Sequence, residues 1–166
     1  SKDNDLRKEC DALLEQAVTH YGLKLIGWRE VPVKPDCLGE IALSAEPTVR
    51  QIFIDGTALK DQELEHKLYF IRKRAERLVK EKFTEQADDF YITTLSCRTI
   101  GYKGMFMAWQ LFAYYPDLND ESFASALAII HQRYSTNTFP NWQLAQPFRC
   151  IAHNGEINTL SGNRNC

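Results

Sequence analysis

The 166-residue sequence lacks a hydrophobic run of membrane-spanning length, an excess of one charge, and any Cys-x-x-Cys pair. Its longest apolar-rich run, from Met105 to Tyr115, is about half of the roughly 20 residues that a transmembrane helix requires. The 20 Lys plus Arg residues against 22 Asp plus Glu give a formal net charge of −2, which provides no field for non-specific binding to nucleic acids or anionic membranes. The sequence therefore predicts neither a membrane protein nor a nucleic-acid-binding protein.

The N-terminus and the cysteines indicate a reducing compartment. Ser1 to Asp5 is polar and acidic, with no apolar stretch behind a basic start, so we expect no secretory signal there. The cysteines are odd in number and widely spaced, unlike a disulfide framework or a zinc site. We therefore expect reduced thiols and no metal site; the five cysteines are Cys10, Cys37, Cys97, Cys150 and Cys166.

What the sequence does contain is enough apolar material for a packed core, with 44% hydrophobic and 11% aromatic residues. Helical spacing of apolar residues predicts one helix from Leu6 to Tyr21, stopped by Gly22, and a second from Leu64 to Leu78. Acidic side chains are interspersed among the basic ones on the second helix, which indicates a solvated face. Strands are expected over residues 23–28 and 49–54, separated by a proline-rich connection with one helical turn near 40–45.

The second half of the sequence predicts more strands. Tyr91–Arg98 has a strand-like composition, and Met105–Tyr114 predicts a short helix buried on most sides and ended by Pro116. Ala124–Ile130 is a continuous apolar run of the kind found in strands covered on both faces, and Phe148–Ala152 is a shorter one. This mixture of helices and strands favours a layered α+β architecture.

Two polar segments follow the last two predicted strands. Residues 131–140 read His-Gln-Arg-Tyr-Ser-Thr-Asn-Thr-Phe-Pro, and residues 152–158 read Ala-His-Asn-Gly-Glu-Ile-Asn. Polar side chains at strand ends are held rigidly by the scaffold, as functional sites require. Composition alone leaves open that Arg133 pairs with a carboxylate and that Asn154-Gly155 is merely a turn.

Taken with the Ala-Gln-Pro-Phe-Arg stretch at 145–149 and Gly-Asn-Arg-Asn at 162–165, these segments resemble the glutaminase domain of glutamate synthase large chains. The stretches at 27–33, 38–39, 50–54, 102–105 and 115–118 are similar to the same family, so the resemblance runs through nearly the whole chain. It implies that residues 1–166 are part of one class II glutamine amidotransferase domain. That family has the N-terminal-nucleophile hydrolase fold, in which two β-sheets are sandwiched between helical layers.

The resemblance also implies a function. The glutaminase part of the family hydrolyses glutamine to glutamate and ammonia, and the ammonia reaches a flavin domain where it meets 2-oxoglutarate. FMN and an iron–sulfur cluster are implied for the full-length protein, with no cofactor in this segment. The implied partners are glutamine, the remaining domains of the large chain and a small reductase subunit, in the cytoplasm or a plastid.

Residue by residue, the resemblance assigns a substrate site. Arg133 matches the position that anchors the substrate α-carboxylate, a task suited to the bidentate guanidinium fork. The Asn154 side-chain amide and the Gly155 N–H match the oxyanion hole. Thr136 matches the substrate-lining loop, with a structural ST-turn as the alternative. His131 and His153 are expected to be structural, because the family's proposed base is the α-amino group of its first residue.

The sequence departs from the family at the nucleophile. The family uses an N-terminal cysteine followed by a glycine-rich strand, whereas this chain begins Ser1-Lys2-Asp3, and none of its cysteines is at that position. The family's aspartate for the substrate amino group also has no counterpart before Cys166. We therefore expect an internal part of the domain, inactive by itself. The alternatives are a non-catalytic glutamine- or glutamate-binding module, or an amidotransferase with another acceptor domain, against which residues 137–140 and 162–165 argue.

Overall fold

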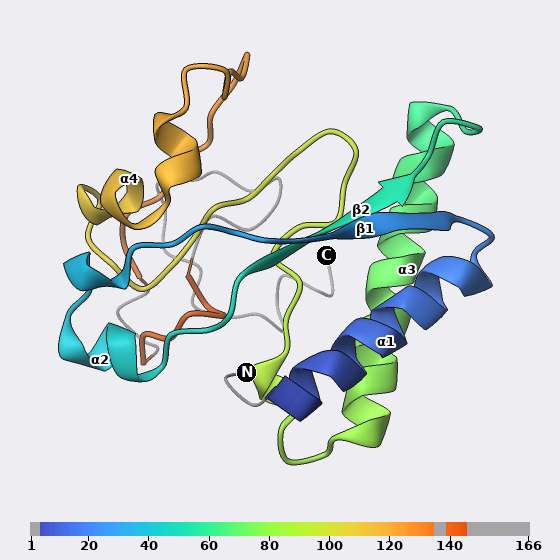
Figure 1. Cartoon of the computed structure of the whole chain (residues 1–166), viewed down its shortest axis with the longest axis horizontal. Helices are drawn as coiled ribbons and strands as arrows, with labels where there is room; N and C mark the ends of the chain where they lie inside the picture. Colours follow the sequence, from blue (N-terminus) through green and yellow to red (C-terminus); the bar gives the residue numbers. More distant parts are fainter. Residues whose placement is uncertain (1–3, 135–138, 146–166) are drawn as a thin grey trace, which may run out of the picture.

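The computed structural model describes residues 4–134 and 139–145, and its two halves are arranged around a two-stranded β-ribbon (Figure 1). The two long helices lie against one end of the ribbon, and the short helices are gathered around its other end. The regular elements are α1 (Asn4–His20), β1 (Lys24–Glu30), α2 (Glu40–Ser44), β2 (Arg50–Asp55), α3 (Asp61–Lys82) and α4 (Gln110–Tyr114), with 3-10 helices at Pro35–Cys37, Ala87–Asp89 and Pro116–Asn119.

Helix α1 ends at a glycine, as its sequence predicts. Gly22 has a φ of +72°, in the left-handed region that glycine enters without a steric penalty. Its N–H donates to the carbonyl of Thr19 at 3.0 Å, and the N–H of Leu23 donates to that of Val18 at 3.2 Å. These two bonds form a Schellman motif, which satisfies the last carbonyls of the helix and turns the chain into β1.

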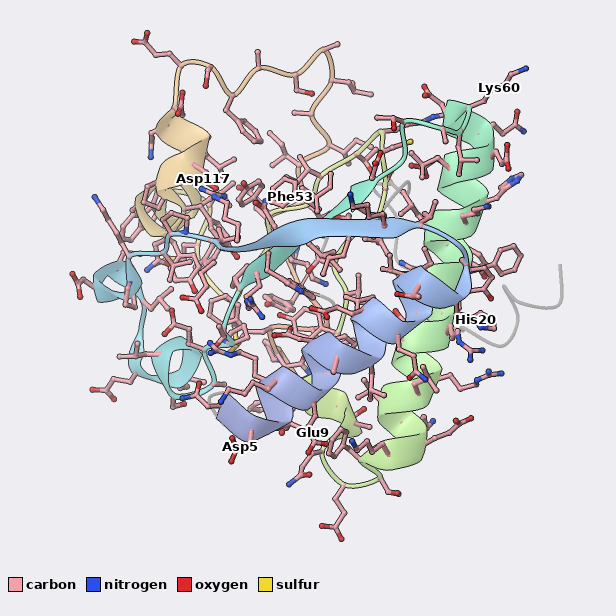
Figure 2. All side chains as sticks on the ribbon, turned by 45° about the vertical axis from the view of Figure 1, so that its right-hand side comes forward. Asp5, Glu9, His20, Phe53, Lys60 and Asp117 are labelled. Carbon is pink, nitrogen blue, oxygen red and sulfur yellow. The ribbon has the colours of Figure 1, made fainter. Side chains whose placement is uncertain are left out.

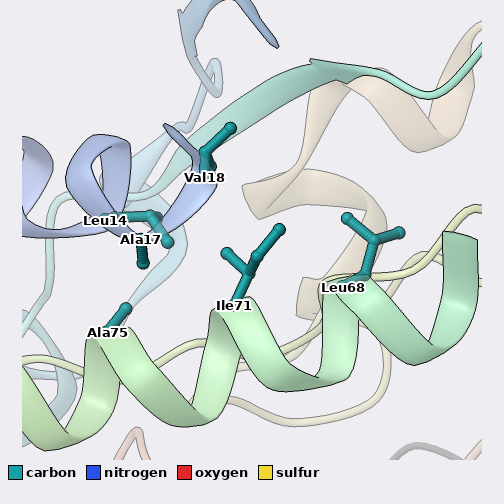
Figure 3. Close-up of a cluster of buried hydrophobic side chains, with 6 residues drawn as sticks. All are labelled: Leu14, Ala17, Val18, Leu68, Ile71 and Ala75. Carbon is teal, nitrogen blue, oxygen red and sulfur yellow. The ribbon is translucent and has the colours of Figure 1, made fainter. Parts of the chain in front are cut away.

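The first core cluster lies between α1 and α3 (Figure 3). Its residues recur every three or four positions on each helix, so that each helix presents one apolar stripe to the other. Trp28, Ile52 and Ile54 from the ribbon pack against the same cluster, which makes two layers, a helix pair and a sheet. The six buried members are Leu14, Ala17, Val18, Leu68, Ile71 and Ala75.

The β1–β2 ribbon is antiparallel and contains one irregularity. Leu25 pairs with Ile54 and Gly27 with Phe53, so Ile26 is an extra residue in β1, as in a β-bulge. The Ile26 side chain is 69% exposed and that of Phe53 is 46% exposed. Phe53 is labelled beside the ribbon in Figure 2. The ribbon therefore has exposed apolar side chains as well as those that pack on the helices.

A second core cluster forms at the other end of the ribbon. It consists mostly of aromatic rings, including two edge-to-face contacts of Tyr115, with Tyr102 at 5.0 Å and with Tyr114 at 4.7 Å between ring centroids. This cluster joins the connection after β1 to the segments around α4; its buried members are Val31, Ala42, Tyr114, Tyr115 and Trp142.

The structure confirms the elements predicted for residues 1–82. Both long helices, both strands and the helical turn near 40–45 are present, with ends shifted by a few residues. Ion pairs between basic and acidic side chains cover parts of α3, including Arg77 with Glu81 and Lys73 with Glu76. This agrees with the interpretation of that helix as having an ordinary solvated face.

The strand predicted at Tyr91–Arg98 is wrong, because this segment is irregular. Its hydroxyl groups bind backbone and side-chain groups in place of a strand ladder: Ser96 Oγ donates to the buried Glu65 at 2.6 Å and accepts from the Arg98 N–H at 3.1 Å. The Thr94 hydroxyl likewise accepts from the N–H of Gly101 at 3.2 Å. Local side-chain bonds of this kind compete with sheet pairing. Cys97 consequently lies in a loop and is exposed.

The helix predicted over Met105–Tyr114 is only partly present, since α4 begins at Gln110. The buried Gln110 side chain accepts a hydrogen bond from the Met107 N–H at 2.7 Å and donates one to the carbonyl of Cys37, and these bonds hold the preceding residues in an irregular path. Trp109 and Phe112 are largely exposed, so this segment is not buried on most sides.

The strand predicted at Ala124–Ile130 is also wrong. The segment is irregular, with Leu127 77% exposed and Ile130 78% exposed. A strand forms only where a neighbour binds its backbone, and within residues 4–134 and 139–145 the strands β1 and β2 pair with each other alone. The shorter strand predicted at Phe148–Ala152 lies outside the described residues.

We expect Ile71→Ala to lower the free energy of unfolding by about 2–5 kcal/mol, because Ile71 is 0% exposed at the centre of the α1–α3 cluster. Phe70→Ala, at the neighbouring and half-exposed position, is the control and is expected to cost clearly less. Urea denaturation followed by circular dichroism measures both variants. Equal losses would contradict the location of the core.

Candidate functional site

Arg133 is the predicted site residue that the structure describes, and it lies on the surface after the irregular 124–130 segment. No carboxylate in the described part of the chain pairs with its guanidinium. His131, expected to be structural, is half-buried. Thr136, Asn154 and Gly155 lie outside the described residues, as does His153. Their convergence with Arg133 around one pocket stays a prediction.

The residue after Arg133 has a defined structural role. The Tyr134 hydroxyl lies 3.0 Å from the carbonyl oxygen of Asn141 and 3.3 Å from that of Gly104, and it donates its proton toward them. Burial raises the pKa of Tyr134 to about 12, so the phenol keeps that proton at neutral pH. The Tyr134 hydroxyl thus links Tyr134, which precedes residues 135–138, and Asn141, which follows them, to the backbone of Gly104.

Trp142 anchors the part of the chain that follows residues 135–138. Its indole N–H donates to the carbonyl of Ala42 at 3.0 Å, and its ring packs edge-to-face on Phe106. A Cβ on Gly104 would lie 2.7 Å from the Trp142 ring and 2.1 Å from that of Phe106. A glycine is therefore required at position 104 for the backbone to approach these two rings.

Lys103 binds the chain beyond Trp142. Its ammonium group donates to the carbonyl oxygens of Gln143 at 2.7 Å and Ala145 at 3.1 Å, and lies 5.4 Å from the centre of the Tyr91 ring. Burial lowers the pKa of Lys103, because removing an ammonium group from water disfavours its charged form. The sequence alone assigned no role to Lys103. The only sequence feature that pointed to it was its place in the stretch at 102–105, which resembles the family.

A polar network connects this region to the sheet. Arg29 of β1 donates two hydrogen bonds of 2.7 Å to the carboxylate of Asp117, and Tyr102 donates a third to it at 3.0 Å. Arg29 also binds the Gln51 side chain of β2 at 2.9 Å. The hydrogen bonds from Arg29, and then that from Tyr102, hold the pKa of Asp117 below its ordinary value. Figure 2 shows Asp117 near one end of the ribbon and His20 near the other.

Cys10 and Cys97 do not have the properties of a catalytic thiol. Burial raises the pKa of the Cys10 thiol inside the α1 stripe. At Cys97, desolvation and then the hydrogen bond and charge of Glu65 raise the pKa as well. A nucleophilic cysteine requires the opposite shift, because the thiolate is the reactive form. Cys37 donates to the carbonyl of Lys34, and the three described cysteines are free thiols.

A cavity of about 470 Å³ lies between α1, the ribbon and residues 89–103. Apolar side chains from the first core and polar ones such as Arg7, Asp11 and Gln51 line it, but Arg133 does not. No group of three or more His, Cys, Asp or Glu residues suited to a metal ion occurs in the described part of the chain. No helix in that part has both the length and the apolar character needed to cross a membrane.

Comparison with known proteins identifies the family. The family model for class II glutamine amidotransferases matches residues 1–166. The chain is 51% identical to the glutamate synthase [NADPH] large chain of Azospirillum brasilense over 162 residues, which cover 97% of this chain and 10% of that protein. The chain belongs to the class II glutamine amidotransferases.

Two further relatives are similar over 99% of this chain. They are the glutamate synthase [NADPH] large chain of Bacillus subtilis (strain 168), at 45% identity and 11% of its length, and the chloroplastic ferredoxin-dependent glutamate synthase of Oryza sativa subsp. japonica, at 43% and 10%.

The chain spans about a tenth of the length of these relatives. Membership in the class II amidotransferases implies the N-terminal-nucleophile hydrolase fold, and the described residues combine helices and strands in agreement with an α+β domain. The relatives include NADPH-, NADH- and ferredoxin-dependent glutamate synthases, so the likeness is shared by enzymes with different electron donors.

We expect Asp117→Asn to lower the free energy of unfolding at pH 7 by about 1.5 kcal/mol, the lower end of the range for hydrogen bonds to charged groups, since the Asp117 side chain is partly exposed. The folded-state pKa of Asp117 is lowered, so its contribution is fully present above the ordinary pKa of about 3.9 and is lost as the pH falls through the folded-state value. The difference between wild type and variant should therefore shrink below about pH 4.

Urea denaturation at several pH values between 3 and 7 measures this difference. Asp88→Asn, at an exposed carboxylate, is the matched control and is expected to change stability little. A difference for Asp117→Asn that stays constant across this range would contradict a stabilising charged pair.

Proposed function

We propose that this chain forms the glutamine-binding and oxyanion-stabilising part of the glutaminase of a glutamate synthase. The observation that supports it best is the exposed Arg133 guanidinium, which has no carboxylate partner in the described residues. The alternative in which Arg133 serves an internal ion pair therefore has no support from the described residues. An unpaired guanidinium can receive the α-carboxylate of glutamine through two parallel N–H···O bonds.

In the proposed reaction, glutamine and water become glutamate and ammonia. A cysteine thiolate adds to the side-chain amide carbon, and the resulting oxyanion accepts hydrogen bonds from the Asn154 side-chain amide and the Gly155 N–H. As this intermediate collapses, the proton lost by the thiol is transferred to the amide nitrogen, so that ammonia leaves and a thioester remains, which water then hydrolyses. Thr136 contributes to the wall of the substrate pocket. The assignments of Thr136, Asn154 and Gly155 rest on the family match.

We further propose that the complete domain is the two-sheet sandwich of its family, with all of residues 1–166 inside one domain. The exposed apolar side chains support this, because Ile26 and Phe53 on the ribbon and Leu127 and Ile130 in the 124–130 segment would be covered by a second sheet. The strand-like composition of residues 91–98 and 124–130 agrees with additional pairing in the complete domain.

The wider assignments follow from the same proposal. The ammonia is used in the reductive amination of 2-oxoglutarate, on a flavin domain outside residues 1–166. FMN and an iron–sulfur cluster are placed in that remainder, where a small reductase subunit is a further partner. The compartment is the cytoplasm or a plastid, the latter in line with the chloroplastic relatives.

We expect Arg133 and Asn154 to affect different kinetic constants in the complete natural polypeptide. Arg133→Ala should raise KM for glutamine and lower kcat/KM about a hundredfold, equivalent to ~3 kcal/mol of charge-assisted hydrogen bonding. Asn154→Ala should lower kcat about 10²–10³-fold, because its amide acts mainly on the developing oxyanion. Ammonia release from glutamine measures both variants.

Arg133→Lys keeps the charge but loses the fork, and should fall between wild type and Arg133→Ala. Arg98→Ala, at another exposed arginine, is the matched control. An unchanged KM for Arg133→Ala would remove the carboxylate-binding assignment.

We expect the 166-residue chain by itself to release no ammonia from glutamine above background, because none of its cysteines occupies the family's nucleophile position. Turnover that is abolished by Arg133→Ala would contradict this. Equilibrium binding of glutamine, measured by calorimetry on the same sample, tests the second candidate, a non-catalytic binding module. Tight binding by a complete natural polypeptide that has no N-terminal cysteine and no turnover would favour that candidate.

A further inference from the structure

We propose that Lys103 is a positioning residue that holds the Arg133 segment and the segment leading to Asn154 and Gly155 in a fixed relation. This inference rests on the proposed function and adds to it a residue that does not itself touch the substrate. It begins from an unusual arrangement, in which two consecutive residues, Lys103 and Gly104, bind the chain on both sides of residues 135–138.

The first half of the arrangement is the Arg133 side. Tyr134 directly follows Arg133, and its hydroxyl reaches the carbonyl oxygens of Gly104 and Asn141 at 3.3 Å and 3.0 Å. The backbone that carries the guanidinium is therefore held one residue away from it. Arg133 itself stays exposed, so the attachment leaves its side chain available.

The second half is the oxyanion side. The Lys103 ammonium donates to the carbonyls of Gln143 and Ala145, at 2.7 Å and 3.1 Å. Ala145 is buried and lies nine positions before Asn154 in the sequence. An ammonium group that binds the carbonyls of two residues on either side of Leu144 holds this segment in place just before the part of the sequence that contains Asn154 and Gly155.

The support beneath Lys103 is itself rigid. Tyr115, which is 2% exposed, donates from its hydroxyl to the Lys103 carbonyl at 2.9 Å. The preceding residue, Tyr102, donates to Asp117, which receives two hydrogen bonds from Arg29 of β1. Because Tyr102 directly precedes Lys103 in the chain, these hydrogen bonds connect the Lys103 backbone to the sheet, and Lys103 can therefore fix the positions of both segments.

The surroundings of Lys103 favour a positioning role over that of an ordinary solvent-exposed lysine. A lysine on the surface keeps its ammonium in water, whereas this one is partly withdrawn from water and placed near the face of the Tyr91 ring. Desolvating an ammonium is unfavourable unless hydrogen bonds compensate it, and the two carbonyls provide that compensation. Small displacements of binding and catalytic groups reduce rates strongly, by as much as about a hundredfold for about 1 Å.

The kinetic test uses the complete natural polypeptide and separates the two halves of the arrangement. Lys103→Met should raise KM for glutamine and lower kcat, with a loss in kcat/KM of about tenfold or more, because both segments lose their reference point. Tyr134→Phe removes only the attachment on the Arg133 side, and should raise KM with kcat changed less than about twofold. Lys103→Arg, which can still donate to both carbonyls, should recover most of the loss.

Two controls accompany these variants. Lys8→Met, at an exposed lysine of α1, should leave kcat and KM unchanged. Glutamate formation from added ammonia bypasses the glutaminase site and should be unchanged in every variant, which shows that the rest of the polypeptide is folded. Unchanged glutamine kinetics in Lys103→Met, or equal losses in Lys103→Met and Lys103→Arg, would overturn the proposal.

Amide hydrogen exchange makes the outcome independent of the proposed function. Lys103→Met should increase exchange at residues 139–145, and Lys103→Arg should restore the protection. If the wild type releases no ammonia from glutamine, the proposed function fails, and exchange alone decides on Lys103. Unchanged exchange at 139–145 in Lys103→Met would then overturn the positioning role.

Discussion

The bidentate pair between Arg29 and Asp117 connects the two halves of the described structure. Arg29 lies on β1, whose neighbouring residue Trp28 packs on the α1–α3 core, whereas Asp117 directly follows the aromatic cluster around Tyr115. Two 2.7 Å hydrogen bonds between a planar fork and a carboxylate fix both distance and orientation, which a single contact cannot do. Tyr102 donates to the same carboxylate, so the Arg29–Asp117 pair also connects the backbone next to Lys103 to the sheet.

The fold of residues 1–82 could be predicted because its signals are local. The stripe of α1, the left-handed Gly22 and the heptad-like spacing of α3 are each decided within a few turns of chain, and the structure agrees with them. The failures lie at residues 91–98 and 124–130, where strand formation depends on a partner elsewhere. An apolar composition predicts that a segment will be covered, but it does not supply the neighbour whose carbonyls and N–H groups complete a ladder.

The site was predictable to a different extent. The roles proposed for Arg133 and Asn154-Gly155 are ones that sequence motifs express directly, since few residue types bind a carboxylate or an oxyanion. Lys103 and Tyr134 were not assigned, because their function depends on backbone carbonyls, which every residue has and no motif marks. The Arg29–Asp117 pair was missed for a related reason: its partners are 88 positions apart, and charged residues occur throughout the sequence.

The bulge at Ile26 has a consequence for handling this polypeptide. One extra residue in β1 leaves a large apolar side chain in water, beside strands that have no third neighbour in the described part of the chain. Such a ribbon is a template onto which another strand can add, whether from its own polypeptide or from a foreign one. Expressed separately, residues 1–166 would offer this template to other copies at high concentration, so dilution and a solubilising fusion partner would serve a preparation better than further purification.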